Sequence, residues 1–353
     1  MYKWLQAAAE AFDRRIGWHR FGLVLSITVI AGAAVVLYRT LSDLDTGEVI
    51  AALRAFSTRD IVLAAGFVAL GYITLTFYDA FALYTIGRQD VPYRVAFVAG
   101  FTSYSVGHNV GASAFTGGAV RYRIYSHHGL SAIEVAKICF VAGFTFWLGN
   151  ATVLGLGVAY APEAASAIDQ LPPWLNRVLA IVILLVLATY VGWVWRTPRI
   201  IGRSNWELTL PNGPLTLIQI GIGIVDLACC AAAMYMLVPS DPYIGFVTVA
   251  TIFVSATLLG FASHSPGGLG VFDAAMLVAL WQYEKEDLVA GLLLFRVLYY
   301  LAPFAIALTI LGAREVWLSM TKAGARSDSK AAPHGPADTR AGHRIGKSKC
   351  DPA

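Results

Sequence analysis

Arginines that follow paired glycines are the residues of this sequence whose type and spacing could bind a ligand. Arg121 and Arg123 come three and five residues after Gly118, and Tyr125 lies one helical turn past Arg121. A guanidinium holds a phosphate through paired, charge-assisted hydrogen bonds, and free backbone N–H groups at a glycine break can add to them. We therefore expect Arg121 to bind a phosphate. Arg123 has an alternative role as a basic anchor at the membrane surface.

A stripe of small polar residues leads up to these arginines. Its members recur at intervals of three or four and so share one helical face: Thr102, Ser105, Asn109, Ser113 and Thr116. In a membrane helix such a face lines a cavity or packs against another helix, and a Gly107-x3-Gly111 spacing favours packing. The chain break that we expect at Gly117-Gly118 favours the cavity.

Three ionisable residues lie inside long apolar runs: Asp79, Asp226 and Arg296. A charge at such depth is unfavourable by several kcal/mol unless it is paired or faces water, so all three are candidates for substrate binding. Asp226 and Arg296 both fall near the middle of their runs. An ion pair that joins the two helices is therefore the alternative, and it is stronger for Arg296.

Other kinds of site find no support in the spacing. The run Gly267-Gly268-Leu269-Gly270 lacks the lysine and hydroxyl of a phosphate-binding loop, and the adjacent His127-His128 cannot both face one metal from a helix. No catalytic triad or carboxylate pair is evident. The four cysteines follow no disulfide or metal pattern: Cys139, Cys229, Cys230 and Cys350. We expect no catalytic residue, no metal and no cofactor.

Composition places these residues in a membrane. Of 353 residues, 57% are hydrophobic and 14% charged, and the mean hydropathy is +0.63, whereas about a quarter of a soluble domain is charged. This predicts an all-α integral membrane protein, a polytopic helix bundle of about seven or more spans. The net charge of +4 comes from basic clusters near the two termini, which orient membrane proteins and do not indicate nucleic acid.

The apolar runs give the expected elements and domains. Unbroken runs fall at about 21–41, 60–86, 132–160, 174–195, 214–238 and 288–312. Two further segments, 95–117 and 244–283, are broken by glycine and small polar residues. We expect an amphipathic arm at 1–20, a transmembrane domain at 21–312 with halves at about 21–160 and 174–312, and a disordered basic tail at 313–353.

Basic residues predict the orientation. The N-terminal arm, the loops 87–94, 119–131 and 196–203, and the tail carry Lys or Arg, whereas 161–173 and 239–243 contain none. We expect a multi-pass protein of the inner membrane with both termini in the cytoplasm and 161–173 outside. This requires 95–117 to enter the membrane from the cytoplasm, turn near Gly117-Gly118 and return.

Two halves of the chain match in pattern. Segments 97–118 and 246–268 both begin with Phe-Val and end in a double glycine, at Gly117-Gly118 and at Pro266-Gly267-Gly268. Asp79 lies 38 residues before Gly117, and Asp226 lies 41 before Gly267. With the orientation above the halves are inverted, as in many secondary transporters with broken helices near the midplane. Chance similarity between two glycine-rich helices is the alternative.

The two glycine motifs resemble those of a known family. The run Thr116-Gly117-Gly118-Ala119-Val120-Arg121-Tyr122-Arg123-Ile124-Tyr125, with His128-Gly129-Leu130 after it, is similar to the first signature of the lysylphosphatidylglycerol synthase transmembrane-region family. Ser265-Pro266-Gly267-Gly268-Leu269-Gly270-Val271-Phe272-Asp273 is similar to the second, although members more often have glutamate where this chain has Asp273. The resemblance covers roughly residues 15–315.

The resemblance implies a function in lipid transport. The family includes the flippase half of the bacterial multiple peptide resistance factor, in which a cytoplasmic synthase domain follows the membrane region. Here a short basic tail follows, so we expect a translocator of a phosphate-bearing lipid, without lysyltransferase activity. Its partners would be anionic or lipid-linked phosphate lipids and a second copy in a homo-oligomer. The alternative is a membrane-embedded enzyme, or a subunit of one, that uses a lipid-linked glycosyl donor.

Overall fold

Long apolar helices make up most of the structure. The computed structural model describes residues 46–110, 113–197, 199–203, 206–263 and 265–314. Five helices within these ranges are long and apolar enough to cross a membrane: α4 (Thr58–Thr85), α7 (Ala132–Tyr160), α9 (Pro173–Trp193), α10 (Gly213–Tyr235) and the helix Lys285–Arg314. They coincide with five of the predicted runs, and the protein is an all-α multi-pass membrane protein. The arm 1–20, the run 21–41 and nearly all of the tail lie outside the described residues.

Shorter elements connect and flank the long helices. They are α3 (Thr46–Ala55), α5 (Tyr93–Val110), α6 (Ser113–Tyr125), the 3-10 turn η1 (Ser126–His128), α8 (Pro162–Asp169), α11 (Phe246–Ala262), the 3-10 turn η2 (Pro266–Gly268) and α12 (Val271–Ala279). The helix that starts at Lys285 is α13 (Lys285–Phe295), and it passes into a π-helix, η3 (Arg296–Leu301). A π-helix leaves carbonyl groups without their usual partners and is frequent at functional sites.

Side-chain caps begin three of the long helices. Ser57 and Asn212 accept hydrogen bonds from backbone N–H groups at the starts of α4 and α10. Ser131 and Glu134 form a capping box at the start of α7, in which each side chain binds the other's backbone N–H. These caps satisfy N–H groups that a helix cannot satisfy itself, so the sequence sets where each helix starts.

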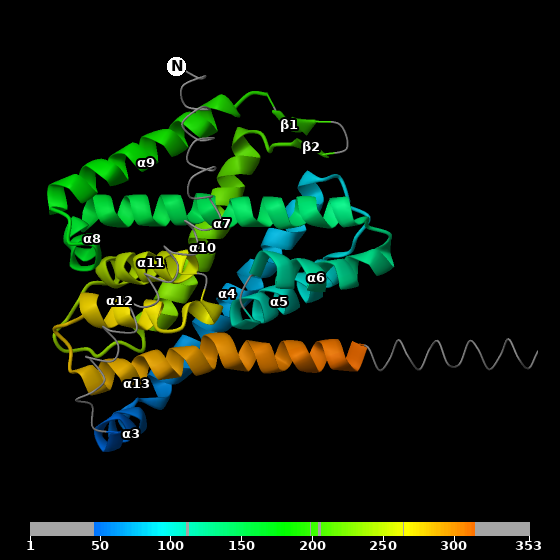
Figure 1. Ribbon diagram of the computed structural model, residues 1–353. Helices are drawn as coiled ribbons and strands as arrows, with labels where there is room; N and C mark the ends of the chain where they lie inside the picture. The colour runs from blue at the N-terminus through cyan, green and yellow to red at the C-terminus, as the bar shows by residue number, and fades with distance from the viewer. Residues whose placement is uncertain (1–45, 111–112, 198, 204–205, 264, 315–353) are drawn as a thin grey trace, which may run out of the picture. The chain divides into compact units, whose positions relative to one another are not determined.

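Helices α4, α7 and α10 pack together at close crossings. In Figure 1, α7 runs across the view while α4 and α10 cross it steeply. At the crossing of α7 and α10, a Cβ on Gly149 would lie 2.7 Å from the Cα of Gly223, so glycine is required on both helices. Such contacts between small residues are typical of helices in lipid, where backbones that approach closely gain van der Waals contact.

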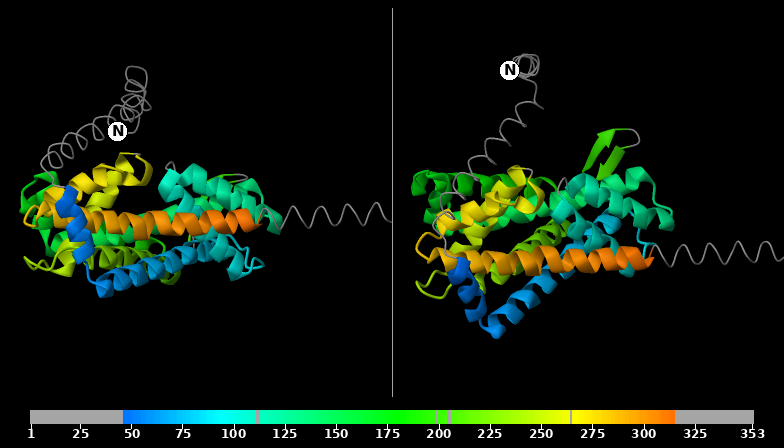
Figure 2. Two further views of the ribbon diagram at one scale, coloured as in Figure 1. Left: turned by 90° about the horizontal axis from the view of Figure 1, so that it is seen from below. Right: turned by 60° about the horizontal axis from the view of Figure 1, so that its bottom comes forward.

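The first glycine-containing segment does not break at Gly117-Gly118. Helix α5 ends at Val110 and α6 begins at Ser113, so Gly117 and Gly118 lie inside a continuous helix and the prediction of a break there is wrong. Figure 2 shows α5 and α6 side by side. A Cβ on Gly117 would lie 3.1 Å from the carbonyl oxygen of Ser103 in α5. The glycine therefore lets α6 pack against α5.

The second broken segment is confirmed. Between α11 and α12 the chain passes through Gly267, Gly268 and Gly270, whose φ angles are 60°, 62° and 81°. Side chains with a Cβ rarely adopt this left-handed conformation, so glycine at these positions ends one helix and starts another. The Asp273 carboxylate accepts a hydrogen bond from Gly270 N at 3.0 Å, which caps α12.

A small hairpin was not predicted. Strands β1 (Ile200–Arg203) and β2 (Trp206–Thr209) pair antiparallel after α9, with Ile201 opposite Leu208. The basic residues at 196–203 had predicted only a loop there. A strand of four residues is too short for its sequence pattern to distinguish it from a loop.

Candidate functional site

A buried ion pair joins α6 to α4. Arg121 Nε donates to both carboxylate oxygens of Asp79 at 3.1 and 3.0 Å, and Nη2 donates to Oδ1 at 2.7 Å. Tyr125 adds a hydrogen bond from its hydroxyl to Oδ2 at 2.8 Å. The side chains of Arg121 and Asp79 are 6% and 0% exposed. Arg121 is thus the counter-ion of an intramembrane carboxylate rather than a basic anchor at the surface.

Glycine and tyrosine shape the space around this pair. A Cβ on Gly100 of α5 would lie 3.5 Å from the Asp79 carboxylate, and one on Gly117 would lie 3.4 Å from Arg121 Nη1. The ring of Tyr104 lies 4.7 Å from the guanidinium carbon, a cation–π contact. The charged groups of α4 and α6 can therefore meet against α5 because glycine at two positions leaves room for them.

The other predicted residues of α6 take different positions. Arg123 points to the exposed side of α6, and Thr116 is half-buried. Gly118 is also half-buried, and a Cβ there would lie 3.6 Å from the sulfur of Cys139 in α7. The predicted site residues of this segment thus divide into a buried group around Arg121 and an exposed group that includes Arg123.

The polar stripe is shorter than predicted. Ser113 and Thr116 belong to α6, so the continuous face ends at Asn109 of α5. Thr102 and Ser105 are buried and donate to carbonyl groups of their own helix at 2.6 and 2.7 Å. Asn109 Nδ2 donates to Ser105 O of its own helix at 2.9 Å and also reaches the second half of the chain through a 3.1 Å hydrogen bond to Tyr300 O in η3.

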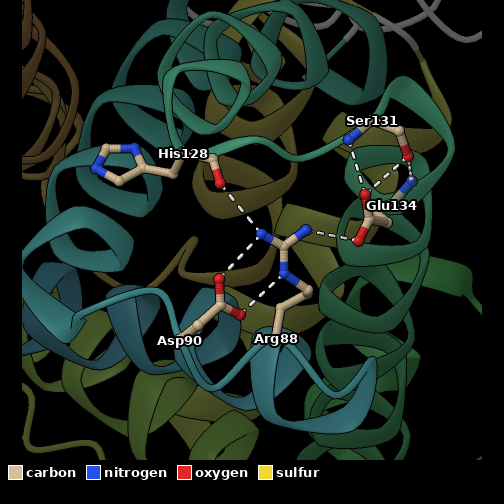
Figure 3. A network of polar contacts seen from close by, with 5 residues as sticks. All are labelled: Arg88, Asp90, His128, Ser131 and Glu134. Atoms are coloured by element: carbon tan, nitrogen blue, oxygen red, sulfur yellow. Dashed lines mark hydrogen bonds and ion pairs between the residues drawn. The ribbon is translucent and has the colours of Figure 1, made fainter.

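Arg88 fastens the end of α6 to two other elements. Figure 3 shows its guanidinium binding Asp90 at 2.9 and 3.0 Å, Glu134 of α7 at 2.7 Å and the carbonyl oxygen of His128 in η1 at 3.1 Å. The Arg88 guanidinium holds the pKa of the Asp90 carboxyl below its usual range. This network fixes η1, which directly follows α6, against the loop after α4 and the start of α7.

A second arginine–carboxylate pair lies at the second glycine break. Arg296 Nε donates to Asp273 Oδ1 at 3.0 Å, Nη2 binds Oδ2, and Nη1 lies 3.4 Å from Gly267 O. The ring of Tyr300 is 5.6 Å from the guanidinium carbon. The two charged side chains are 16% and 15% exposed. This pair is more accessible than the pair of Arg121 and Asp79.

The partner of Arg296 differs from the one considered from the sequence. Arg296 pairs with Asp273 of α12, so the alternative of an ion pair with Asp226 is wrong. Asp226 faces α4 from α10, is 3% exposed and accepts a hydrogen bond from Tyr78 at 3.0 Å. Sequence reasoning missed Asp273 as a site residue, although an acid within an apolar stretch directly after a glycine break is a signal for one.

The two halves meet at the end of α5. A Cβ on Gly267 would lie 3.4 Å from His108 O. The His108 ring is 5.8 Å from both Tyr104 and Tyr299, and its Nδ1 is buried without a hydrogen-bond partner in the described part of the chain. Side chains of α4 and α5 also bind η3, because Tyr72 donates to Tyr299 O at 2.9 Å in addition to the bond of Asn109. Aromatic rings thus fill the space between the first half and the second.

Backbone donors at the second break are already used. Gly268 N donates to Ser265 O at 3.1 Å and Gly270 N to Asp273, so these two N–H groups at the break already have partners. Within the described residues no three His, Cys, Asp or Glu side chains converge as metal ligands. What the arrangement offers chemically is two guanidinium groups, each held by a carboxylate that another anion could replace.

Comparison with known proteins identifies relatives over most of the chain. The chain is 28% identical to an uncharacterized protein of Synechocystis sp. over 76% of this chain and 84% of that one. It is 26% identical to inner membrane protein YbhN of Escherichia coli, over 82% and 91%. It is 27% identical to a phosphatidylglycerol lysyltransferase of Staphylococcus haemolyticus over 82% of this chain, which spans 33% of that longer protein. The family model for the lysylphosphatidylglycerol synthase TM region matches residues 22–307, and the chain therefore belongs to this family.

Proposed function

We propose that this protein moves a lipid with a phosphate-bearing head group between the leaflets of the inner membrane. The observation that carries the proposal is the presence of two arginine–carboxylate pairs inside a membrane-spanning helix bundle, those of Arg121 with Asp79 and Arg296 with Asp273. Such charges are unfavourable in lipid and usually mark the path of a substrate or ion. A planar guanidinium binds a phosphate, like a carboxylate, through two parallel hydrogen bonds.

In this mechanism the phosphate takes the place of a carboxylate. The head group first meets Arg296, whose side chain is 16% exposed, and displaces Asp273 from it. Gly267 and Gly268 allow the adjacent backbone to move, because their left-handed conformations form a joint between α11 and α12. Arg121 is 6% exposed and receives the phosphate after a further rearrangement of the bundle. Each carboxylate rebinds its arginine as the lipid leaves.

The arrangement of α4 and α10 supports the idea of two inverted halves. A Cβ on Gly71 would lie 3.6 Å from Cys230, whereas Tyr78, two turns later in α4, binds Asp226. Residue numbers thus increase along α4 as they decrease along α10, so the two helices run antiparallel. Antiparallel equivalents are what an inverted repeat requires, and rocking of such halves is a common route to alternating access. Both termini lie in the cytoplasm in this proposal.

Lipid exchange in vesicles tests the function. The protein would be reconstituted in vesicles with fluorescent phosphatidylglycerol, chosen because the staphylococcal relative is a phosphatidylglycerol lysyltransferase. Chemical quenching of the probe in the outer leaflet would then measure how fast the lipid exchanges between leaflets. Arg296→Lys should slow exchange about ten- to a hundredfold, because one charge-assisted contact contributes about 1.5–3 kcal/mol. Arg121→Lys should also slow it. Arg123→Lys is the matched control, since this exposed residue keeps its charge, and should exchange lipid at the wild-type rate.

Two results would refute the proposal. Folded wild-type protein that never speeds exchange of any anionic phospholipid over empty vesicles would exclude translocation. Equal rates for wild type, Arg296→Lys and Arg121→Lys would exclude the guanidinium sites. The same vesicles supplied with a lipid-linked sugar would reveal the alternative activity as a new glycosylated product.

A further inference from the structure

The carboxylate of Asp226 differs from the other two intramembrane carboxylates. Asp79 and Asp273 each bind an arginine, whereas the hydrogen bonds to Asp226 in the described residues come from Tyr78 Oη at 3.0 Å and from Cys230 Sγ at 3.9 Å. Its side chain is buried between α4 and α10. A carboxylate anion without a counter-ion is strongly disfavoured at such a place, so the group is neutral at rest.

The pattern that relates the two halves explains why no arginine of the described residues pairs with Asp226. When the two double glycines are aligned, the position of Asp226 in the second half differs by three residues from that of Asp79 in the first. Arg121 stands three residues after the first double glycine, and Val271 stands three residues after the second. The second half therefore has the acid and lacks the arginine that would neutralise it.

The other titratable groups around Asp226 keep their protons, so its carboxyl is the group of this cluster that can exchange one. The titratable side chains that interact with it come from α4, α5, α10 and η3, and they are Tyr72, Tyr78, Tyr104, Cys229, Cys230 and Tyr299. Phenols and thiols of this kind are neutral at physiological pH. Within the described chain, moreover, no group of ligands suited to a metal ion includes Asp226.

Asp226 is also linked to the first ion pair. Tyr78, its hydrogen-bond donor, is the residue before Asp79 in α4. The ring of Tyr78 contacts the ring of Tyr104 at a centroid distance of 6.0 Å, and Tyr104 in turn lies under the guanidinium of Arg121. A negative charge that appears on Asp226 would therefore act on the same arginine that Asp79 holds, and would weaken the hold of Asp79 on it.

We propose that Asp226 takes up and releases one proton in each transport cycle and so couples lipid movement to the proton gradient. This rests on the proposed function. On one side of the membrane the carboxylate takes a proton from hydronium and forms an O–H bond, leaving water. On the other side that O–H bond breaks and the proton passes to water, so that hydronium forms and the carboxylate anion is restored. No oxidant, reductant or further reactant takes part.

Infrared difference spectra between acid and alkaline pH test the proton site directly and need no transport. The wild-type protein in vesicles should lose a band of a buried protonated carboxyl as the pH rises, and Asp226→Asn should not show this band. Asp287→Asn, at the exposed start of α13, is the matched control and should keep it. A wild-type spectrum without such a band, or the same band in Asp226→Asn, would overturn the proposal.

The leaflet distribution of fluorescent phosphatidylglycerol tests the coupling. With the membrane potential clamped, a gradient of one pH unit acting on one proton per lipid should change the outer-to-inner ratio about tenfold in wild-type vesicles. In Asp226→Asn the gradient should leave the ratio unchanged. If wild-type protein exchanges lipid but the leaflet ratio does not change with the pH gradient, proton coupling is wrong and the translocator function is still supported. A ratio that follows a sodium gradient instead would replace the proton with that cation.

Discussion

Removal of one member of the buried pair of Arg121 and Asp79 should destabilise the protein more than removal of both. In Arg121→Ala, the fully buried Asp79 carboxylate keeps the hydrogen bond from Tyr125 and loses three from the guanidinium. Breaking a buried pair in this way costs about 3–5 kcal/mol, chiefly because a charge is left without a partner. The double variant Asp79→Ala/Arg121→Ala leaves neither charge and should be more stable than either single variant.

The second pair provides the comparison for this prediction. Asp273 and Arg296 are 15% and 16% exposed, so water can solvate the charge that remains after one partner is removed. We therefore expect Arg296→Ala to lower the free energy of unfolding by roughly 1.5–2.5 kcal/mol, half as much as Arg121→Ala, because solvent screening weakens ion pairs that are partly exposed.

We would unfold the purified protein in detergent with increasing denaturant and follow the loss of helix by circular dichroism. These curves give the free energies of unfolding for both double-mutant cycles. The coupling energy between Asp79 and Arg121 should exceed that between Asp273 and Arg296. If Arg121→Ala is as stable as the wild type, or if the two coupling energies are equal, the burial of the first pair does not govern its energy and the reasoning fails.

Three further outcomes are expected. Gly149→Ala should lower the free energy of unfolding by about 1–3 kcal/mol, because its methyl group would collide with α10, whereas Gly143→Ala, with open space around it, should be neutral. Arg88→Ala should cost only about 1 kcal/mol because the residue is partly exposed, but amide hydrogen exchange at the end of α6 should become faster. A cysteine at Leu171 should react with an impermeant thiol reagent in intact cells, and one at Arg123 should not; the opposite result would invert the proposed orientation.

Composition and local sequence determined the class of this protein and much of its secondary structure. Apolar runs long enough to cross a bilayer became helices at nearly the predicted bounds, because a backbone in lipid has to satisfy its own hydrogen bonds. The break at Gly267 and Gly268 was also predictable, since positive φ angles favour glycine wherever they occur. The presence of acids and arginines inside apolar runs, and hence the existence of a polar site in the membrane, followed from the sequence in the same way.

Tertiary structure decided which of these charges meet. Arg121 binds Asp79, Arg296 binds Asp273, and no arginine of the described residues binds Asp226, because partners across helices depend on where and at what angle the helices cross. The role of Gly117 was equally undetermined, since a glycine can break a helix or let it approach another, and only the position of α5 made it a packing residue. Spacing along a chain shows which side chains share a helical face, and packing between helices determines what that face contacts.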